Sequence, residues 1–204
     1  MKFIEKKPTN EPKEVVEKRL TPGSKFDDLP KKALREALLK EQGFICAYCM
    51  RRINNNEKST KIEHWSPRNK DNEKDYTNLL AVCNGNMGKP PAEQHCDTLK
   101  GNQTITISPL KPTCEKLVKF GPVGYVYSDD PNIEVELESR LGLNRQHLVD
   151  ERAKLLDRLK DAMQKAAKNN PDSKLKKADL TGMLKEWQDQ KGGEFEPFCQ
   201  VAIA

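Results

Sequence analysis

Cys46-Ala47-Tyr48-Cys49 opens the stretch that decides the fold of this chain, residues 46–101. Glu63-His64 follows, then Asn78-Leu79-Leu80-Ala81-Val82-Cys83, then His95-Cys96-Asp97-Thr98-Leu99-Lys100-Gly101. The stretch holds four of the six cysteines and two of the three histidines of the chain. Two pairs of cysteines suggest a structural zinc. Carboxylates beside a histidine and an asparagine suggest a second, hydrolytic metal site built on that zinc scaffold.

The zinc ligands are expected to be Cys46, Cys49, Cys83 and Cys96. Zinc accepts four thiolate or imidazole ligands tetrahedrally, and a gap of two residues lets one tight turn present both sulfurs of the first pair. The second pair encloses the longer interval 84–95, whose glycines and prolines allow it to loop out. His95 remains an alternative fourth ligand in place of Cys83 or Cys96. Because Cys114 and Cys199 are isolated in sequence, we interpret them as buried small side chains.

Glu63 and His64 are the first residues of the predicted catalytic site. Hydrolysis of a phosphodiester requires an activated water and a cation that neutralises charge on the phosphate. His64 can accept the proton of the water, because neutral imidazole predominates near pH 7. Glu63 is a suitable ligand for a magnesium-type ion, but its side chain points to the other face of a strand unless the backbone twists or bulges there.

Three later residues complete that site. Asn78 can hydrogen-bond a backbone carbonyl or the imidazole and so hold the loop in a fixed orientation. Asp97 would supply a second oxygen to the catalytic ion. Lys100 is a candidate contact to the nucleic-acid phosphate. Each residue also has an ordinary interpretation, as a turn residue, a helix cap or a solvated lysine, and only their joint order favours catalysis.

Hydrophobic periodicity predicts how this site is built. Apolar residues recur at helical spacing over residues 29–42, and Gly43 is a plausible helix end. Short strands are expected at 61–65 and 78–82, separated by a polar loop, with a helix beginning at 94–99. We divide the chain into an N-terminal extended arm (1–28), a zinc-containing core (29–110) and an accessory region (111–204).

The accessory region is predicted to contain a small β-hairpin and two helices. Residues 104–107, 124–127 and 133–137 alternate with the period of a strand. Asn144 is a candidate cap for a long helix, and Asp179 for a last one. The tail 195–204 is apolar, which indicates either a partner-binding segment or a segment that folds back onto the domain.

Composition excludes several classes of protein. The hydrophobic content of 35% against 33% charged residues predicts a modest core, for which a metal staple would be valuable. The net charge of +5 is compatible with a local contact to nucleic acid but is too small for general electrostatic wrapping. The chain shows neither a signal peptide nor an apolar run that could span a bilayer, so we expect a cytoplasmic protein with reduced thiols and no membrane partner.

The order of these residues resembles the HNH endonuclease family, whose ββα-metal unit often lies on a four-cysteine zinc site. In the family's pattern an acidic residue precedes the first histidine, an asparagine opens an apolar step into a cysteine, and a cysteine followed by His or Asn and then Lys-Gly closes the unit. Here Asp97 stands at that closing position. This departure replaces an imidazole or amide by a carboxylate, which should preserve the binding of a hard cation, and leaves His95 as a rival ligand of the catalytic ion.

The resemblance extends outside the core to the PtuB-type HNH subunits of Septu and retron-associated anti-phage systems. The segments that carry it are 34–43 leading into the first cysteine pair, the His95-Cys96-Asp97 step, and Leu141-Gly142-Leu143-Asn144 before a long helix. The resemblance implies a defence nuclease that works with an ATPase of the ABC or SMC-like kind. In retron versions a reverse transcriptase and its DNA–RNA hybrid restrain the assembly.

The expected fold is therefore α+β: a zinc-stabilised ββα-metal (HNH) core with flanking helices and a small accessory β-hairpin. The expected function is a metal-dependent endonuclease acting on DNA or RNA, including transfer RNA, with structural zinc and catalytic Mg²⁺ or Mn²⁺. The competing hypothesis is a zinc-stabilised module that binds nucleic acid or protein without cutting. Such a module needs the cysteines, but it does not need Glu63, His64, Asn78 and Asp97 together.

Overall fold

The computed structural model describes residues 1–171 and 174–204. Its helices and strands follow the chain in the order α1 (Lys13–Leu20), α2 (Lys31–Glu41), β1 (Thr60–His64), β2 (Leu79–Cys83), α3 (Cys96–Lys100), α4 (Cys114–Leu117), β3 (Lys119–Phe120), β4 (Val126–Tyr127), α5 (Pro131–Val135), α6 (Gln146–Lys168), α7 (Lys177–Gln188) and α8 (Cys199–Ile203). Short 3-10 turns and one π-helical turn, η4 (Glu136–Arg140), join them.

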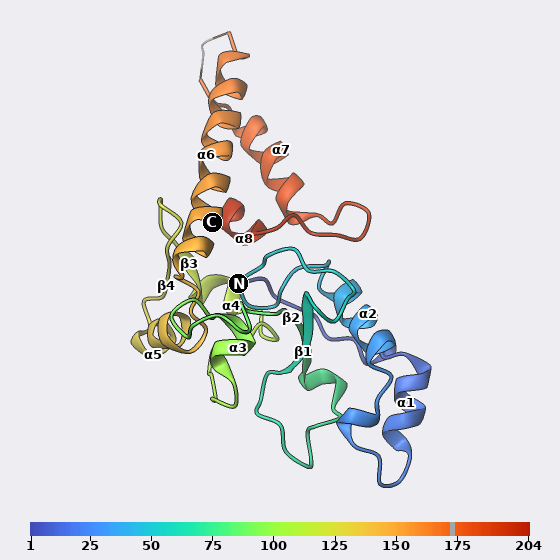
Figure 1. The fold of residues 1–204 in the computed structure, drawn as a ribbon. Coiled ribbons are helices and arrows are strands. Elements are labelled where there is room, and N and C mark those ends of the chain that lie inside the picture. The colour runs from blue at the N-terminus through green and yellow to red at the C-terminus, as the bar shows by residue number, and fades with distance from the viewer. Residues whose placement is uncertain (172–173) are drawn as a thin grey trace.

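The ββα unit lies at the centre of the molecule (Figure 1). β1 and β2 pair antiparallel without a bulge, from Thr60 opposite Cys83 to His64 opposite Leu79. Every residue of β2 is buried, whereas Lys61 and Ile62 in the middle of β1 are only half-buried. α3 contacts β2. The two predicted strands and the helix after them are therefore confirmed, each within two residues of its expected bounds.

Gln42 connects α2 to this unit. Its side chain is 2% exposed and makes two hydrogen bonds to the backbone of Ala81 in β2: Nε2 donates to the carbonyl at 2.7 Å, and Oε1 accepts from the amide at 2.7 Å. Nε2 also donates to the carbonyl of Ile45 at 3.0 Å. A glutamine amide thus completes the hydrogen bonding of an edge strand in place of a third strand.

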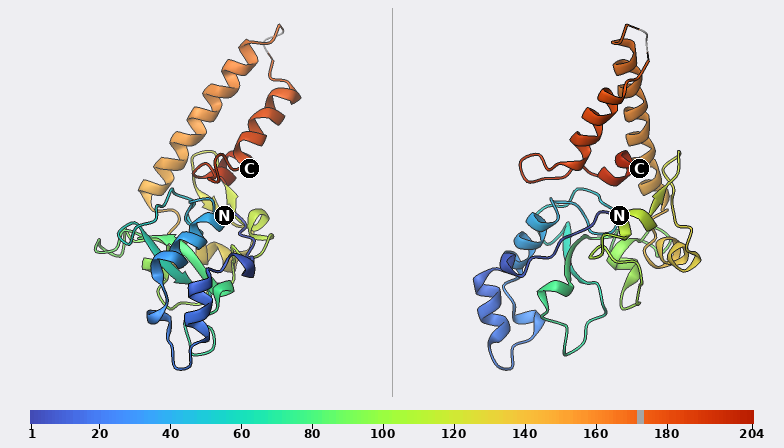
Figure 2. Two further views of the ribbon diagram at one scale, coloured as in Figure 1. Left: turned by 90° about the vertical axis from the view of Figure 1, so that its right-hand side faces the viewer. Right: turned by 180° about the vertical axis from the view of Figure 1, so that it is seen from behind.

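The prediction of an extended N-terminal arm is wrong. Residues 13–20 form α1, and the segment before it is held to the core by the amide of Ile4, which donates to the carbonyl of Pro109 at 2.8 Å. Val15 is the buried residue of α1, and Phe26 is buried farther along. The few apolar residues of this segment therefore suffice to dock it, although its composition is polar. Figure 2 shows α1 and α2 together on one side of the ββα unit.

The predicted accessory hairpin is correct only in its middle segment. β3 pairs with β4, placing Lys119 opposite Tyr127. Residues 104–107 do not form a strand, because the amides of Thr106 and Ile107 donate to the buried carboxylate of Glu136 at 2.8–2.9 Å. Residues 133–137 are helical, because Asp130 accepts hydrogen bonds from the first amides of α5 and thereby caps it.

The C-terminal helices form an arm above the core. α6 rises from the accessory region, α7 returns beside it, and α8 lies at the base of α6 in all views (Figures 1 and 2). The predicted long helix is confirmed, but Asn144 does not cap it, since its side chain exchanges hydrogen bonds with the backbone of Val126 in β4. Asp179 does cap α7, where its carboxylate accepts from the amide of Lys176 at 2.8 Å.

The apolar tail folds back onto the domain. Phe198, Cys199 and Val201 are buried, in one cluster with Ile45 and Met50 of the cysteine-rich segment. The amide of Phe198 also donates to the carbonyl of Met50 at 3.0 Å. Of the two interpretations of this tail, the structure therefore supports internal packing. Among the helices of residues 1–171 and 174–204, none has both the length and the apolarity required to cross a lipid bilayer.

The Gln42 bridge makes a testable prediction about stability. In Gln42→Leu, the buried amide of Ala81 loses its partner and its carbonyl keeps only the amide of Ala47, so we expect the free energy of unfolding to fall by about 2 kcal/mol. The same change at the exposed Gln164 of α6 should alter it by no more than about 0.5 kcal/mol. Urea unfolding of the zinc-loaded chain measures both values. Equal stability of the two variants would show that the bridge is unimportant.

Candidate metal centre and active site

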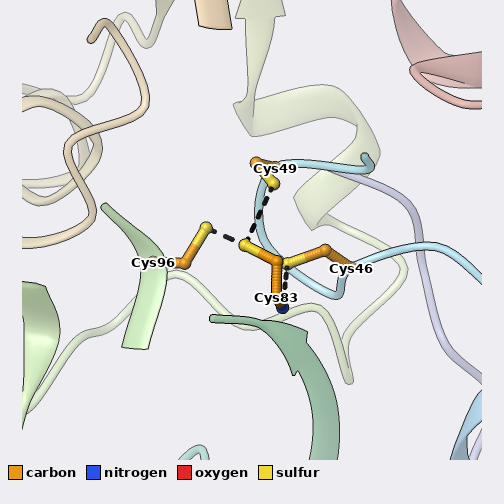
Figure 3. A group of neighbouring side chains, drawn as sticks. All are labelled: Cys46, Cys49, Cys83 and Cys96. Atoms are coloured by element: carbon orange, nitrogen blue, oxygen red, sulfur yellow. Dashed lines mark hydrogen bonds between the residues drawn. The ribbon is translucent and has the colours of Figure 1, made fainter. Parts of the chain in front are cut away.

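Four thiols converge at the junction of the cysteine-rich segment, the end of β2 and the start of α3 (Figure 3). The sulfur atoms of Cys46, Cys49, Cys83 and Cys96 all lie within 4.8 Å of one another, and all four residues are buried. Two of the pairs, Cys46–Cys96 and Cys49–Cys83, are 3.9 and 3.8 Å apart. Tetrahedral Zn²⁺ with bonds of about 2.3 Å requires sulfur–sulfur distances of about 3.8 Å. The donor set and its spacing therefore fit zinc, as the sequence predicts.

The surroundings of the thiols favour one ionised sulfur, that of Cys46. Although burial opposes ionisation, hydrogen bonds from the other three thiols hold the pKa of Cys46 well below its usual range, whereas burial and the interaction with Cys46 hold the pKa of Cys49 and of Cys96 well above it. Arg152 of α6 is 1% exposed, and its guanidinium donates to the carbonyls of Gly124 and Leu143. Burial lowers its pKa to about 10, against the opposing attraction of Cys49 and Cys96, so it stays positive at neutral pH. Its charge partly offsets that of a zinc–thiolate centre.

His95 lies beside the thiols without belonging to the set of four. Its Nδ1 is 3.1 Å from the sulfur of Cys96 and 3.8 Å from that of Cys83. Its ring also stacks at a tilt on His147, with centroids 5.0 Å apart. The structure therefore favours neither predicted role of His95, as a zinc ligand or as a ligand of the catalytic ion. The position suits a group that donates a hydrogen bond to a thiolate.

Glu63 lies on the face of β1 that is covered by the cysteine-rich segment and α3. Its Oε1 accepts a hydrogen bond from the hydroxyl of Tyr48 at 3.1 Å and pairs with the ammonium of Lys100 at 2.7 Å. Glu63 is 6% exposed and Lys100 is 1% exposed. A buried carboxylate is thus partnered by a cation and a neutral donor, as burial of charge requires.

Asp97 is next to Glu63, as predicted from the order of residues. Burial, a hydrogen bond with Asp97 and the negative charge of Asp97 raise the pKa of Glu63 to about 8, against the opposing effect of Lys100. Asp97 also pairs with Lys61 at 3.2 Å, and these two side chains, 20% and 25% exposed, connect the cluster to solvent. Such a pair of oxygen ligands fits a hard divalent cation.

The side chain of His64 projects from the opposite face of β1. Its Nε2 is 2.9 Å from the carbonyl oxygen of Glu73, and its ring packs edge-on against Phe26 with centroids 4.6 Å apart. A carbonyl oxygen can only accept, so Nε2 carries the proton and Nδ1 keeps its lone pair. Burial lowers the pKa of His64, which leaves the imidazole neutral at pH 7. This tautomer is the one that a general base requires.

Asn78 fixes the loop that follows His64. Its Oδ1 accepts from the amide of Ser66 at 2.8 Å, and its Nδ2 donates to the carbonyl of Ser66 at 3.0 Å. The backbone carbonyl of Asn78 accepts from the amide of Trp65 at 3.0 Å. The expected hydrogen bond between Asn78 and a backbone carbonyl is therefore present, and it holds residues 65–66 against the start of β2.

The sequence-predicted site residues thus form two groups. Glu63, Asp97 and Lys100 lie together on one face of the β1–β2 ribbon, while His64 and Asn78 lie at the end of β1 on the other. The bulge that would have turned Glu63 and His64 to one face does not occur. The predicted contact of Lys100 with nucleic acid is not supported by its position, because its ammonium is buried against Glu63 and also donates to the carbonyl of His64 at 3.3 Å.

Sequence reasoning missed the residues that support these groups: Tyr48, Lys61, Phe26 and Glu73. Lys61 precedes Glu63 by two positions, which puts both side chains on one face of a strand, so this neighbour was visible in the sequence. Tyr48 lies between two cysteines of the four-thiol cluster, where the direction of its side chain depends on the folded turn. Glu73 acts through its backbone carbonyl, and Phe26 comes from a distant segment, so neither gives a sequence signal.

The four-thiol site makes a prediction about zinc content. Cys96→Ser should lower bound zinc from one per chain to near zero, because three thiolates hold the ion far less tightly. The unfolding midpoint should fall by about 10 °C or more, since the site joins three segments of the core. Elemental analysis and thermal unfolding measure these changes. Cys114→Ser changes a thiol outside the cluster and should keep one zinc per chain. Zinc retained by Cys96→Ser would contradict the assignment.

The chain is similar in sequence to one protein named as a retron component. It is 27% identical over 152 residues to the protein named "Retron Vc95 putative HNH endonuclease" from Vibrio cholerae serotype O1 biovar El Tor. The alignment covers 69% of this chain and 71% of that protein. No family model matches the chain. This distant relationship agrees with the resemblance to HNH endonucleases in the sequence and with the ββα unit beside a four-cysteine site.

Proposed function

We propose that this chain is a metal-dependent HNH endonuclease that hydrolyses phosphodiester bonds of nucleic acid. The observation that carries the proposal is the adjacent pair Glu63 and Asp97 on a ββα unit beside a four-cysteine cluster, together with His64 at the end of β1, whose Nε2 bears the proton. The relationship to a retron protein named as an HNH endonuclease supports it. The substrate class is DNA or RNA, including transfer RNA.

His64 acts as the general base. The carbonyl of Glu73 holds the proton on Nε2, so Nδ1 takes a proton from the attacking water. Asn78 keeps the loop after His64 in place through its paired hydrogen bonds to Ser66, and so orients the imidazole indirectly. Because burial lowers the pKa of His64, the base is in its active, neutral form at physiological pH.

Glu63 and Asp97 would hold the catalytic Mg²⁺ or Mn²⁺. When bound, such an ion neutralises charge on the phosphate and stabilises the leaving oxygen. The two carboxyl groups meet on the opposite face of β1 from His64, and His64 is the last residue of that strand. A phosphodiester that lies across the end of β1 can therefore contact both groups. Asp97 and Lys61 are the partly exposed members through which it would approach.

The partners of the nuclease are proposed from the same resemblance. The relative belongs by name to a retron. We infer that this chain is the effector subunit of an anti-phage complex with an ABC or SMC-like ATPase, in which a reverse transcriptase and its DNA–RNA hybrid restrain cutting. The activity would take place in the cytoplasm, where these partners and the nucleic acid are found.

A zinc-stabilised binding module without activity is the second candidate. The observation that favours it is the buried Lys100–Glu63 ion pair, which satisfies the carboxylate without any metal. In that case the cluster would only stabilise the fold, and the chain would bind nucleic acid or a protein partner through its surface. The two candidates differ in whether Asp97 and His64 are needed for cleavage.

Cleavage assays with matched variants decide between them. The purified zinc-loaded chain with Mg²⁺ or Mn²⁺ should cleave plasmid DNA, single-stranded DNA or RNA substrates, and His64→Ala should reduce the rate at least about 100-fold. Asp97→Asn should reduce it similarly by weakening the ion site. Asp71→Asn makes the same change at an exposed loop carboxylate and should leave the rate unchanged.

Zinc content and thermal unfolding of each variant serve as controls for the fold. A folded, zinc-containing His64→Ala protein that still cleaves at the wild-type rate would refute the catalytic assignment. A wild-type chain that binds nucleic acid but cuts none of the substrates, with or without its partners, would favour the binding module.

Partnership makes a separate prediction. Expression together with the neighbouring genes of its own genome should yield a stable complex with an ATPase subunit, detected by co-purification and mass determination. Sequencing of cleaved nucleic acids from cells with and without those neighbours should show cleavage controlled by the complex. Identical cleavage products in both conditions, with no co-purified ATPase, would contradict the proposed partnership.

A further inference from the structure

Both groups that hold Glu63 bind the same oxygen atom. The hydroxyl of Tyr48 donates to Oε1 at 3.1 Å, and the ammonium of Lys100 lies 2.7 Å from Oε1. Among the hydrogen bonds of residues 1–171 and 174–204, none to the other oxygen, Oε2, accompanies the one to Oε1, and Asp97 lies beside the carboxylate. The carboxylate of Glu63 is thus anchored through only one of its two oxygens.

Asp97 is held in the same asymmetric way. Its Oδ2 pairs with the ammonium of Lys61 at 3.2 Å, and Oδ1 has no cationic or donor partner among the described residues. Lys61 is itself fixed, because its ammonium donates to Thr98 Oγ1 at 2.7 Å, and that hydroxyl donates to the carbonyl of Asn84 at 2.7 Å. Each carboxylate therefore has one oxygen that is anchored by a hydroxyl or an ammonium, and the two carboxyl groups otherwise face each other.

We propose that Tyr48, Lys100 and Lys61 are positioning residues that each fix one oxygen of Glu63 or Asp97 and so present Glu63 Oε2 and Asp97 Oδ1 to a divalent cation. This inference rests on the proposed function, since it assigns the support of the same ion site. It adds three residues that neither touch the reacting atoms nor bind zinc. Ion binding fixes a freely rotating carboxylate and so costs conformational entropy. Anchoring one oxygen beforehand reduces this cost.

Tyr48 gives this arrangement its rigidity. It lies between the zinc ligands Cys46 and Cys49 and is 1% exposed, so the zinc knuckle sets the position of its hydroxyl. The hydroxyl of Tyr48 donates to Glu63 Oε1 at 3.1 Å, so the knuckle fixes this oxygen as well. The structural zinc and the ion-binding carboxylate are thus connected through a single side chain.

Substitutions of the two lysines can distinguish a positioning role from a purely electrostatic one. A nearby ammonium repels a cation, so its removal should strengthen cation binding if charge is its only effect. If the lysine instead holds the carboxylate in place, its removal weakens binding despite the lost repulsion. The direction of the change therefore distinguishes the two roles.

The experiment measures Mn²⁺ binding to the zinc-loaded full chain by calorimetry and by the electron paramagnetic resonance signal of free Mn²⁺. Tyr48→Phe should keep one zinc per chain and weaken Mn²⁺ binding about tenfold, the effect of one hydrogen bond to a charged group. Lys61→Gln and Lys100→Gln should also weaken it. Tyr125→Phe removes a hydroxyl from a half-exposed tyrosine outside the cluster and should bind Mn²⁺ like the wild type.

Unchanged Mn²⁺ affinity in Tyr48→Phe, or higher affinity in Lys61→Gln, would overturn the inference. If Tyr48→Phe loses zinc, Lys61→Gln decides alone, because Lys61 is partly exposed and far from the zinc knuckle in sequence. A wild-type chain that binds no Mn²⁺, or binds it equally in Asp97→Asn, also overturns it. Mn²⁺ binding that depends on these anchors without any nuclease activity would refute the proposed function and leave the inference standing.

Discussion

The convergence of four cysteine thiols at one point is the constraint on which the rest of the structure depends. It joins the cysteine-rich segment, the end of β2 and the beginning of α3, three segments that are far apart in sequence. Cys96 adopts a left-handed backbone with φ of 53°, an unfavourable conformation that its place in the cluster accounts for. In a chain with only 35% hydrophobic residues, a metal cross-link at this junction would substitute for a larger core.

The chemistry of the carboxylate pair follows from this scaffold. The turn between Cys46 and Cys49 places the hydroxyl of Tyr48 against Glu63, and the helix that begins at Cys96 carries Asp97 and Lys100 to the same place. Burial, a hydrogen bond with Asp97 and the charge of Asp97 raise the pKa of Glu63 to about 8, and the ammonium groups of Lys100 and Lys61 offset only part of the repulsion between the two carboxylates. A divalent cation relieves that repulsion, which is why we interpret the cluster as an ion site.

The places where sequence reasoning failed share one physical cause, competition from distant partners. Residues 104–107 alternate like a strand, but the carboxylate of Glu136 takes the amides that a strand would have used. Residues 1–28 have the composition of a loose arm, yet Phe26 reaches the ring of His64 and Val15 is buried. The apolar tail resembles a docking segment, but it fills a cluster with Ile45 and Met50. None of these partners is local in sequence.

The sequence by itself determined which four cysteines cluster, the two strands of the ββα unit, the helix after them and the proximity of Glu63 to Asp97, because cysteine spacing and short-range hydrophobic pattern are local properties. Only the tertiary structure decided that Lys100 is buried against Glu63, that His95 lies beside the thiols, and that His64 and Glu63 leave opposite faces of a regular strand. These outcomes depend on which side chains meet after segments tens of residues apart have packed, and burial then decides which charges must find a partner.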